Sequence, residues 1–269
     1  MKKILITLVA FFAMAQSAIA DEISAYLQGK YVDVSSAKSK LASAGFEVVT
    51  EYASVKDGVT IIFTNSALKA EASKPTRAHA AVLRLFVDNQ EKTISVTNPV
   101  YFGQAFMQDD YNAKVFEAQL ASINKAFPGL TGSADKLDAD DISGYHFMMG
   151  MPYYEDPDEL GEGKCTDLLA QAKAYKGGKF FLFSIKLSEK SYLVGYDLAK
   201  RTKKFVAKIG RANASVLPYT ISIENGKATS LAPKYYLAVS YPLLSMGEFT
   251  TIATVPGAIN KDLTKPFKK

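Results

Sequence analysis

Cysteine and histidine are the scarcest chemically versatile residues in this 269-residue chain, which has one cysteine, Cys165, and two histidines, His79 and His146. A single cysteine excludes an internal disulfide, a haem attachment site and a metal site built of cysteines alone. No Gly-x-Ser-x-Gly motif precedes a helix, and no Ser-His-Asp or Cys-His arrangement is recognisable. The sequence therefore offers no motif for an enzyme, and we expect a protein without catalytic activity.

Strong net charge is also missing. The formal charge is +5, and Lys2 and Lys3 supply two of these positive charges, which leaves +3 without them. So weak a balance does not point to a nucleic-acid partner. Hydrophobic residues make up 48% of the chain and charged residues 22%. These values are ordinary for a globular protein with room for two small domains or one large one.

The first twenty residues have the pattern of a secretory signal peptide. Lys2 and Lys3 are followed by an apolar run, Ile4 to Met14, and then by the small residues around Ala20. The alternative is a buried N-terminal helix. With cleavage after Ala20 the mature protein would begin at Asp21 and be exported, most simply to a bacterial periplasm. No later run has the eighteen or so apolar residues of a membrane-spanning helix, so we expect no transmembrane segment in the mature chain.

Two stretches of the chain share one pattern of strand, turn, strand, proline and helix. They are residues 84–107 and 219–246. Val87-Asp88-Asn89 aligns with Ile223-Glu224-Asn225, and Ser95-Val96-Thr97 aligns with Ser230-Leu231-Ala232, before Pro99 and Pro233. This repetition predicts an α/β (α+β) fold of two similar sheet-plus-helix units. The expected divisions are residues 1–20 for the signal peptide, 21–128 and 164–269 for the units, and 129–163 for a connector.

Local patterns predict several elements around these hairpins. Apolar residues at 116, 120, 123 and 127 share one face of a helix, which Asp109 or Asp110 would cap. A second helix is expected over residues 198–209. The apolar residues between 246 and 263 also have helical spacing, but the β-branched residues of 250–255 leave a strand possible there. Asn225-Gly226 predicts a tight hairpin turn.

The order of these pieces resembles the domain-of-unknown-function 302 family. The resemblance is carried by a helix leading to Gly-Phe, a strand ending in Asn, and a hairpin ending in Asn-Pro, which stand here at Leu41 to Phe46, Thr60 to Asn65 and Arg84 to Pro99. It extends over residues 35–127 and, less closely, over 165–264, where Val194-Gly195-Tyr196-Asp197 and Ala232-Pro233 replace the family's Asn-ended pieces. The resemblance implies small α/β domains, sometimes paired, so that a tandem copy would be a built-in pseudo-dimer. It implies no particular chemistry.

Aromatic residues follow the proline of each hairpin. Such residues commonly belong to a core, but facing a cleft between two units they would line an apolar ligand pocket. A hydrophobic island, residues 145–154, lies inside the polar connector and is expected to pack near the same place. The candidate ligand-binding residues are therefore Tyr101, Phe102, Tyr145, Tyr235 and Tyr236.

The connector island also contains His146, Met148, Met149 and Met151. Thioether and imidazole ligands suit Cu(I) in an exported protein, because soft ligands select soft metals. The acidic residues Asp156, Asp158 and Glu159 would instead attract a harder cation. The simpler interpretation is that the methionines fill irregular gaps between the two units, which their flexible side chains suit.

Three further features favour ordinary structural roles. His79 is expected at a turn or on the surface, and Cys165 is expected to be a small buried residue at the start of a helix. The run of basic residues from Lys200 to Lys208 could bind an anion or a lipid headgroup, but such a run more often forms a solvated helix face. Glycines around Lys164 lack the spacing of a phosphate-binding loop.

Taken together, these patterns predict an exported, periplasmic, non-enzymatic binding or accessory protein with no cofactor. Its partner would be a small apolar molecule or another exported protein, and not a nucleic acid. The alternative is a copper or other soft-metal protein that uses His146 and the three neighbouring methionines.

Overall fold

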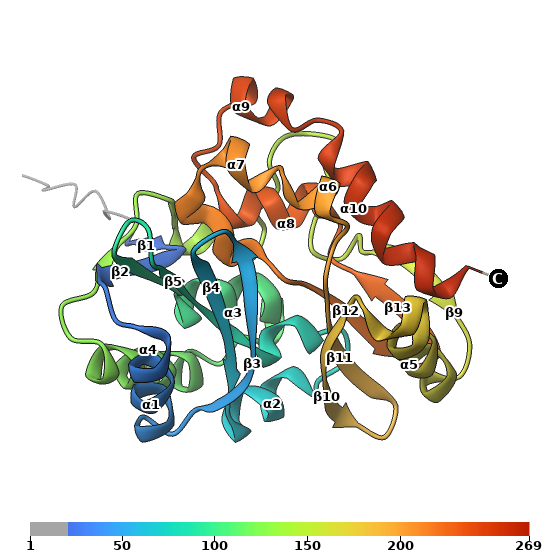
Figure 1. Ribbon diagram of the computed structural model, residues 1–269, viewed down its shortest axis with the longest axis horizontal. Coiled ribbons are helices and arrows are strands. Elements are labelled where there is room, and N and C mark those ends of the chain that lie inside the picture. Colours follow the sequence, from blue (N-terminus) through green and yellow to red (C-terminus); the bar gives the residue numbers. More distant parts are fainter. Residues whose placement is uncertain (1–20, 269) are drawn as a thin grey trace, which may run out of the picture.

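The computed structural model describes residues 21–268 (Figure 1). The predicted signal peptide, residues 1–20, lies outside the described residues. Helices and antiparallel sheets are mixed throughout, which confirms the α+β prediction. The part before the connector contains β1 (Glu22–Ser24), β2 (Tyr26–Lys30), α1 (Val34–Ser43), β3 (Glu47–Val55), β4 (Gly58–Thr64), α2 (Ser66–Ala72), η1 (Ala78–Ala81), β5 (Leu83–Asp88), β6 (Thr93–Thr97), α3 (Pro99–Met107), η2 (Gln108–Asp110) and α4 (Ala113–Ala126).

The elements of the connector come next. The elements after the connector then follow an order similar to that of the elements before it. The connector holds β7 (Thr131–Gly132), β8 (Lys136–Asp138), η3 (Ala139–Asp141) and β9 (Asp158–Glu162). After it come α5 (Cys165–Ala174), η4 (Tyr175–Gly178), β10 (Phe181–Ser188), β11 (Ser191–Tyr196), α6 (Lys200–Lys203), α7 (Val206–Ile209), η5 (Arg211–Val216), β12 (Tyr219–Glu224), β13 (Lys227–Ser230), α8 (Pro233–Ser240), α9 (Met246–Thr251), α10 (Val255–Thr264) and η6 (Lys265–Phe267).

The two large sheets have the same topology. Their strand orders are β3-β4-β5-β6-β2-β7 and β10-β11-β12-β13-β9, so β7 alone lacks a counterpart in the second sheet, and every pair is antiparallel. We call residues 26–107, from β2 to α3, the first repeat and residues 158–240, from β9 to α8, the second repeat. The connector therefore supplies an edge strand, β9, to the second sheet; its counterpart in the first sheet is β2, beyond which β7 forms the edge. Neither β2 nor β9 was expected from the sequence.

The strand register aligns the repeats residue by residue. Asp88 lies opposite Thr93, and Glu224 lies opposite Lys227, so the second hairpin turn is two residues shorter. Asn225 and Gly226 both have positive φ, as the tight turn predicted from their sequence requires. Ser95 consequently aligns with Thr229, not with Ser230. The sequence alignment was one residue out there because it placed one of the two missing residues after the strand instead of in the turn.

Side-chain caps explain where several helices begin. Asn65 accepts a hydrogen bond from Leu68 N at the start of α2, and Asn98 accepts one from Val100 N at the start of α3. No side chain caps α4, whose N-cap residue is Asn112, so the cap predicted at Asp109 or Asp110 is wrong. Both residues lie in η2 instead.

Two other local expectations are settled by the structure. The helix predicted over residues 198–209 is split into α6 and α7, with a turn at residues 204–205 between them. The alternative of a strand at 250–255 is wrong. Ser245 and Glu248 form a capping box that begins α9, and Pro256 lies in the first turn of α10, where its missing N–H costs nothing.

Each sheet has one face covered by its own repeat and one face turned toward the other repeat. Helix α1 packs on β3 and β4, and α5 packs on β11, β12 and β13. On the opposite faces η5 of the second repeat contacts the strands from β3 to β6, while η1 of the first repeat contacts β11 and β12. Each repeat thus packs one 3-10 segment on the sheet of the other repeat, so the contact between the repeats is reciprocal.

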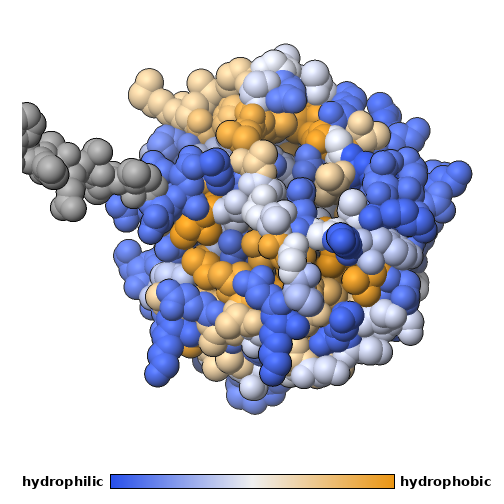
Figure 2. Space-filling view, turned by 90° about the vertical axis from the view of Figure 1, so that its left-hand side faces the viewer, coloured by the Kyte–Doolittle hydropathy of each residue, from blue (hydrophilic) through white to orange (hydrophobic). Residues whose placement is uncertain are grey.

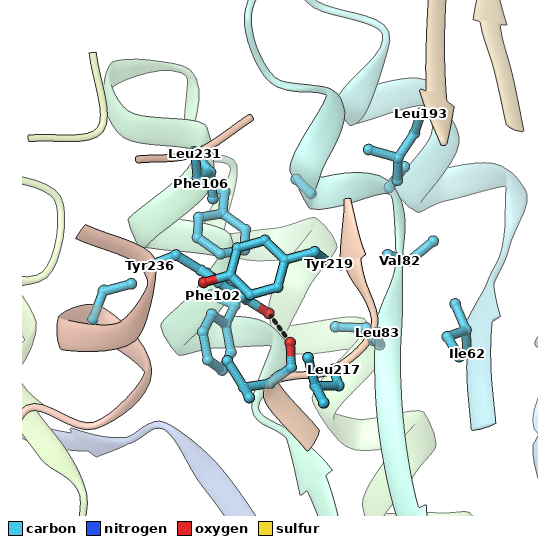
Figure 3. Close-up of a cluster of buried hydrophobic side chains, with 14 of the residues drawn as sticks. Ile62, Val82, Leu83, Phe102, Phe106, Leu193, Leu217, Tyr219, Leu231 and Tyr236 are labelled. Carbon is cyan, nitrogen blue, oxygen red and sulfur yellow. Dashed lines mark hydrogen bonds between the residues drawn. The ribbon is translucent and has the colours of Figure 1, made fainter. Parts of the chain in front are cut away.

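One hydrophobic core runs through both repeats. Figure 3 shows Ile62, Val82, Leu83, Phe102 and Phe106 of the first repeat among Leu193, Leu217, Tyr219, Leu231 and Tyr236 of the second. These side chains are buried. Hydrophilic residues dominate the face in Figure 2, with hydrophobic areas between them. Because the core is continuous, the two repeats pack together as one folded unit and are not independent domains joined by a linker.

Candidate functional site

A cavity of about 790 Å³ lies on the inward face of the second sheet. Its floor carries Ser222 of β12, Thr229 of β13 and Glu159 of β9. One wall is residues 75–79, which lead into η1 of the first repeat, and another is residues 154–157 at the end of the connector. The cavity is thus built where the two repeats and the connector meet.

The same face of the first sheet is filled. Ser222 aligns with Phe86, and Glu224 aligns with Asp88. Phe86 and Asp88 are each only 1% exposed, and Arg211 Nε of the second repeat donates to the two Asp88 carboxylate oxygens at 2.9 and 2.8 Å. A serine in place of a phenylalanine removes a ring from the second interface. The difference between the repeats therefore leaves the space that the cavity occupies.

His79 lies on the cavity wall, in the short 3-10 segment η1, and is buried, so of the turn or surface position predicted for it the surface alternative is wrong. Its Nδ1 hydrogen-bonds Thr220 Oγ1 at 2.9 Å. Burial, together with the nearby positive charge of Arg84, lowers the pKa of His79 to about 3. The imidazole is therefore neutral at pH 7 and too weak a base to activate the Thr220 hydroxyl. It is suited to hydrogen bonding and not to proton transfer.

Thr76 joins the wall to the other two sides of the cavity. Its backbone N–H donates to Glu224 Oε2 at 3.0 Å, and its carbonyl accepts a hydrogen bond from the Tyr154 hydroxyl. Thr76 has a φ of 63°, a left-handed conformation that β-branched residues rarely adopt. Arg77 lies over the Tyr154 ring, 5.5 Å from its centroid, and donates to Asp110 at 2.9 Å. The wall is held in a strained conformation by contacts to every side of the cavity.

The lining is mixed: apolar surface forms the larger part of it, and charged and hydroxyl side chains form the rest. Acidic side chains outnumber basic ones, with Glu155, Asp156, Glu159 and Glu224 against Arg77 and Lys227. Lys227 forms an ion pair with Glu159. The floor adds the hydroxyls of Ser222 and Thr229, and the wall adds the neutral ring of His79. Such a set provides hydrogen-bond donors and acceptors for a small molecule.

The aromatic residues predicted to bind a ligand lie behind this cavity and not on its surface. Tyr101, Phe102, Tyr235 and Tyr236 are at most 6% exposed and pack between α3 and α8. Tyr145 is half-buried, and burial raises its pKa to about 12. Tyr235 reaches the cavity only through Tyr154, whose ring it meets edge-on at 6.0 Å. Their ligand-binding role stays a prediction, and their positions make them the packing surface between the repeats.

The predicted metal-binding residues lie on an outer loop of the connector. The His146 ring packs against the Tyr153 ring at a tilt of 37°, and its Nε2 lies 3.3 Å from the Tyr153 hydroxyl. Met148 is 44% exposed and Met149 is 93% exposed, whereas Met151 packs against the core. Within residues 21–268, no three His, Cys, Asp or Glu side chains are grouped to hold a metal ion.

Cys165 is the first residue of α5, as predicted, but it is only half-buried. Its sulfur donates to Lys190 O and accepts from Gly226 N at 3.2 Å, which ties α5 to two hairpin turns. The cavity residues Arg77, Ser222 and Glu224 were not found from the sequence. The signal that could have found them is the exchange of Phe86 for Ser222 between the aligned repeats.

Comparisons with known proteins give no relative: no family model, curated protein or solved structure matches this chain. Among the described helices, none combines the length and apolar character needed to cross a bilayer. Functional inference therefore depends on the geometry of the chain itself.

Proposed function

We propose that this protein is an exported, non-enzymatic binding or accessory protein whose ligand occupies the cavity between η1, the second sheet and Tyr154. The observation that supports this proposal most directly is a difference between the inward faces of the two sheets. The first inward face is closed by Phe86 and by the Asp88–Arg211 pair, whereas the second keeps a space of about 790 Å³. A volume in this range suits a small organic molecule.

The mixed lining suits a ligand that has hydrogen-bonding groups as well as apolar surface, whereas the sequence predicted a small apolar molecule. Ser222 and Thr229 offer hydroxyls, and His79 offers a neutral imidazole. Tyr154 and Leu231 add apolar surface beside them. The strained wall at Thr76 supports the same proposal, because strain of this kind is retained where a site must keep its shape.

Native mass spectrometry of the mature protein, purified from its own host, tests the proposal. We expect a co-purifying small molecule on the wild-type protein and on Ser222→Ala, which keeps the cavity open. Ser222→Phe copies the first repeat and should remove the molecule, because the ring fills its space. Thermal unfolding of all three proteins shows whether each is folded. Equal occupancy in folded Ser222→Phe and Ser222→Ala would rule out this cavity as the binding site.

A soft-metal function is the second candidate, favoured by the exposure of the Met148 and Met149 thioethers. It predicts stoichiometric binding in a Cu(I) titration of the mature protein. The double substitution Met148→Leu with Met151→Leu should weaken that binding, because leucine keeps the volume and removes the sulfur. Absent binding, or binding that the double variant leaves unchanged, would end this hypothesis.

A further inference from the structure

A second cavity, of about 550 Å³, lies between α6–α7 and α10; Figure 1 shows α6 beside α10. Its walls come from segments distant in the sequence. Residues 199–208 form one wall, and residues 254–265 form the other. The basic side chains that line it are Arg201, Lys204, Lys208, Lys261 and Lys265.

Asp262 is the acidic residue in this lining, and its carboxylate is fully engaged. It accepts hydrogen bonds from Ala199 N at 3.0 Å, Thr202 Oγ1 at 2.6 Å and Lys265 Nζ at 2.7 Å. Burial favours the neutral acid, but these hydrogen bonds outweigh burial and lower the pKa of Asp262. The ionised carboxylate of Asp262 therefore links the two walls by hydrogen bonds and forms an ion pair only with Lys265.

The other cations of the cavity have no carboxylate partner within the described chain. For Arg201, Lys204 and Lys261, no Asp or Glu oxygen of residues 21–268 lies within ion-pair distance. Lys208 donates to the carbonyl of Thr251, a neutral group. Positive charges gathered in a concavity repel one another, and the field they produce attracts anions.

Arg201, Lys204 and Lys208 are exposed, as expected of a solvated helix face, but a cation from a second segment joins them. A solvated face points its charges outward from one helix, whereas Lys261 comes from α10 and faces the same cavity as Arg201 and Lys204 of the other wall. We propose that this cavity binds a multiply charged oxyanion of the phosphate type. Arg201 would supply planar paired donors to the oxyanion, and the two lysines would supply point charges.

Two probes present phosphate groups in different forms. Inorganic pyrophosphate is a free anion in solution, and phosphatidylglycerol vesicles present a lipid headgroup, with phosphatidylcholine vesicles as the reference. We would measure pyrophosphate binding by calorimetry and vesicle binding by co-sedimentation, both at low ionic strength. Binding of pyrophosphate alone assigns a free anion, and selective binding of the anionic vesicles assigns a lipid headgroup. Raising the salt should weaken either interaction, because solvent-exposed charges are screened.

The triple variant Arg201→Gln, Lys204→Gln, Lys261→Gln should bind at least about tenfold more weakly, since it removes three charge-assisted hydrogen-bond donors. The matched control is Lys56→Gln, Lys114→Gln, Lys234→Gln, which removes the same charge from exposed positions elsewhere. The proposal is overturned if the wild-type protein binds neither probe, or if the two triple variants bind equally well. Ser222→Phe should not change this binding, so the result is independent of the function proposed above.

Discussion

Tyr101 and Tyr235 occupy equivalent positions in α3 and α8, and each donates its hydroxyl hydrogen bond across the interface to the other helix. Tyr101 donates to Val239 O at 2.7 Å, and Tyr235 donates to Ala105 O at 3.1 Å. The two acceptors are themselves equivalent, because Pro99 and Pro233 begin the two helices. This exchange is the contact pattern of a twofold-symmetric dimer, formed here within one chain.

Removing either hydroxyl should therefore lower the stability. We expect Tyr101→Phe and Tyr235→Phe each to lower the free energy of unfolding by about 0.5–1.5 kcal/mol, because each removes one buried hydrogen bond across the interface. Urea denaturation of the mature protein measures this change. Tyr153→Phe, at an exposed ring, is the control. A loss for one tyrosine and none for the other would contradict an equivalent role.

The Asp88–Arg211 pair joins the repeats at the filled interface. Asp88 accepts hydrogen bonds from Arg211 and from the backbone N–H groups of Gln90 and Glu91. Although burial opposes it, this set lowers the pKa of the Asp88 carboxyl. We expect Asp88→Asn to destabilise the protein by about 2–3 kcal/mol, since it leaves the arginine charge without a counterion. Glu91→Gln, on the exposed turn, is the matched control in the same denaturation experiment.

The buried imidazole of His79 should make stability depend on pH. Burial lowers its pKa from 6.5 to about 3, so below pH 6.5 the unfolded chain binds a proton that the folded chain does not. The free energy of unfolding should consequently fall from pH 6.5 toward pH 3, by up to about 1.4 kcal/mol per pH unit from this group. His79→Gln should make that dependence shallower. Urea denaturation at several pH values measures it, and an identical slope in wild type and variant would show that His79 contributes nothing.

Gly195 lies opposite Phe183 on neighbouring strands, with the phenylalanine ring directly over its Cα. A methyl group at this position would overlap the ring. We expect Gly195→Ala to lower the free energy of unfolding by about 1–3 kcal/mol through overpacking. Phe183→Leu in the same chain should recover part of the loss by making room. A double-mutant cycle by denaturation tests this coupling, which additivity of the two single changes would disprove.

How far the sequence predicts the fold can be judged at the edges of the two sheets. The hairpins at 83–97 and 219–230 were expected from alternation and turn residues, because both signals act over a few neighbouring residues. The strands β2 and β9, at or next to the edge of each sheet, were not expected, since their pairing with β6 and β13 joins segments far apart in the chain. Such a strand needs little hydrophobic patterning of its own, so its neighbours decide that it is a strand.

The candidate site was also predicted only in part, because the sequence shows local patterns and not contacts between distant segments. Its aromatic surroundings were visible in the sequence, and they proved to be the packing between the repeats. The cavity itself depends on which residue faces which across the interface: Phe86 closes one side, and Ser222 leaves the other open. His79 shows the limit most clearly, since nothing near it in the sequence indicates that Thr220 and Arg84 lie beside it.

The sequence alone determined the hairpins, their turns, most helices and the repetition of one unit, because hydrophobic periodicity and backbone preferences are local properties. Only the tertiary structure decided that η1 and η5 are exchanged between the repeats, and that one inward face is filled while the other holds a cavity. It also brought Lys261 opposite Arg201. The physical reason is that a cavity or a charge cluster belongs to side chains that meet only after the chain has folded.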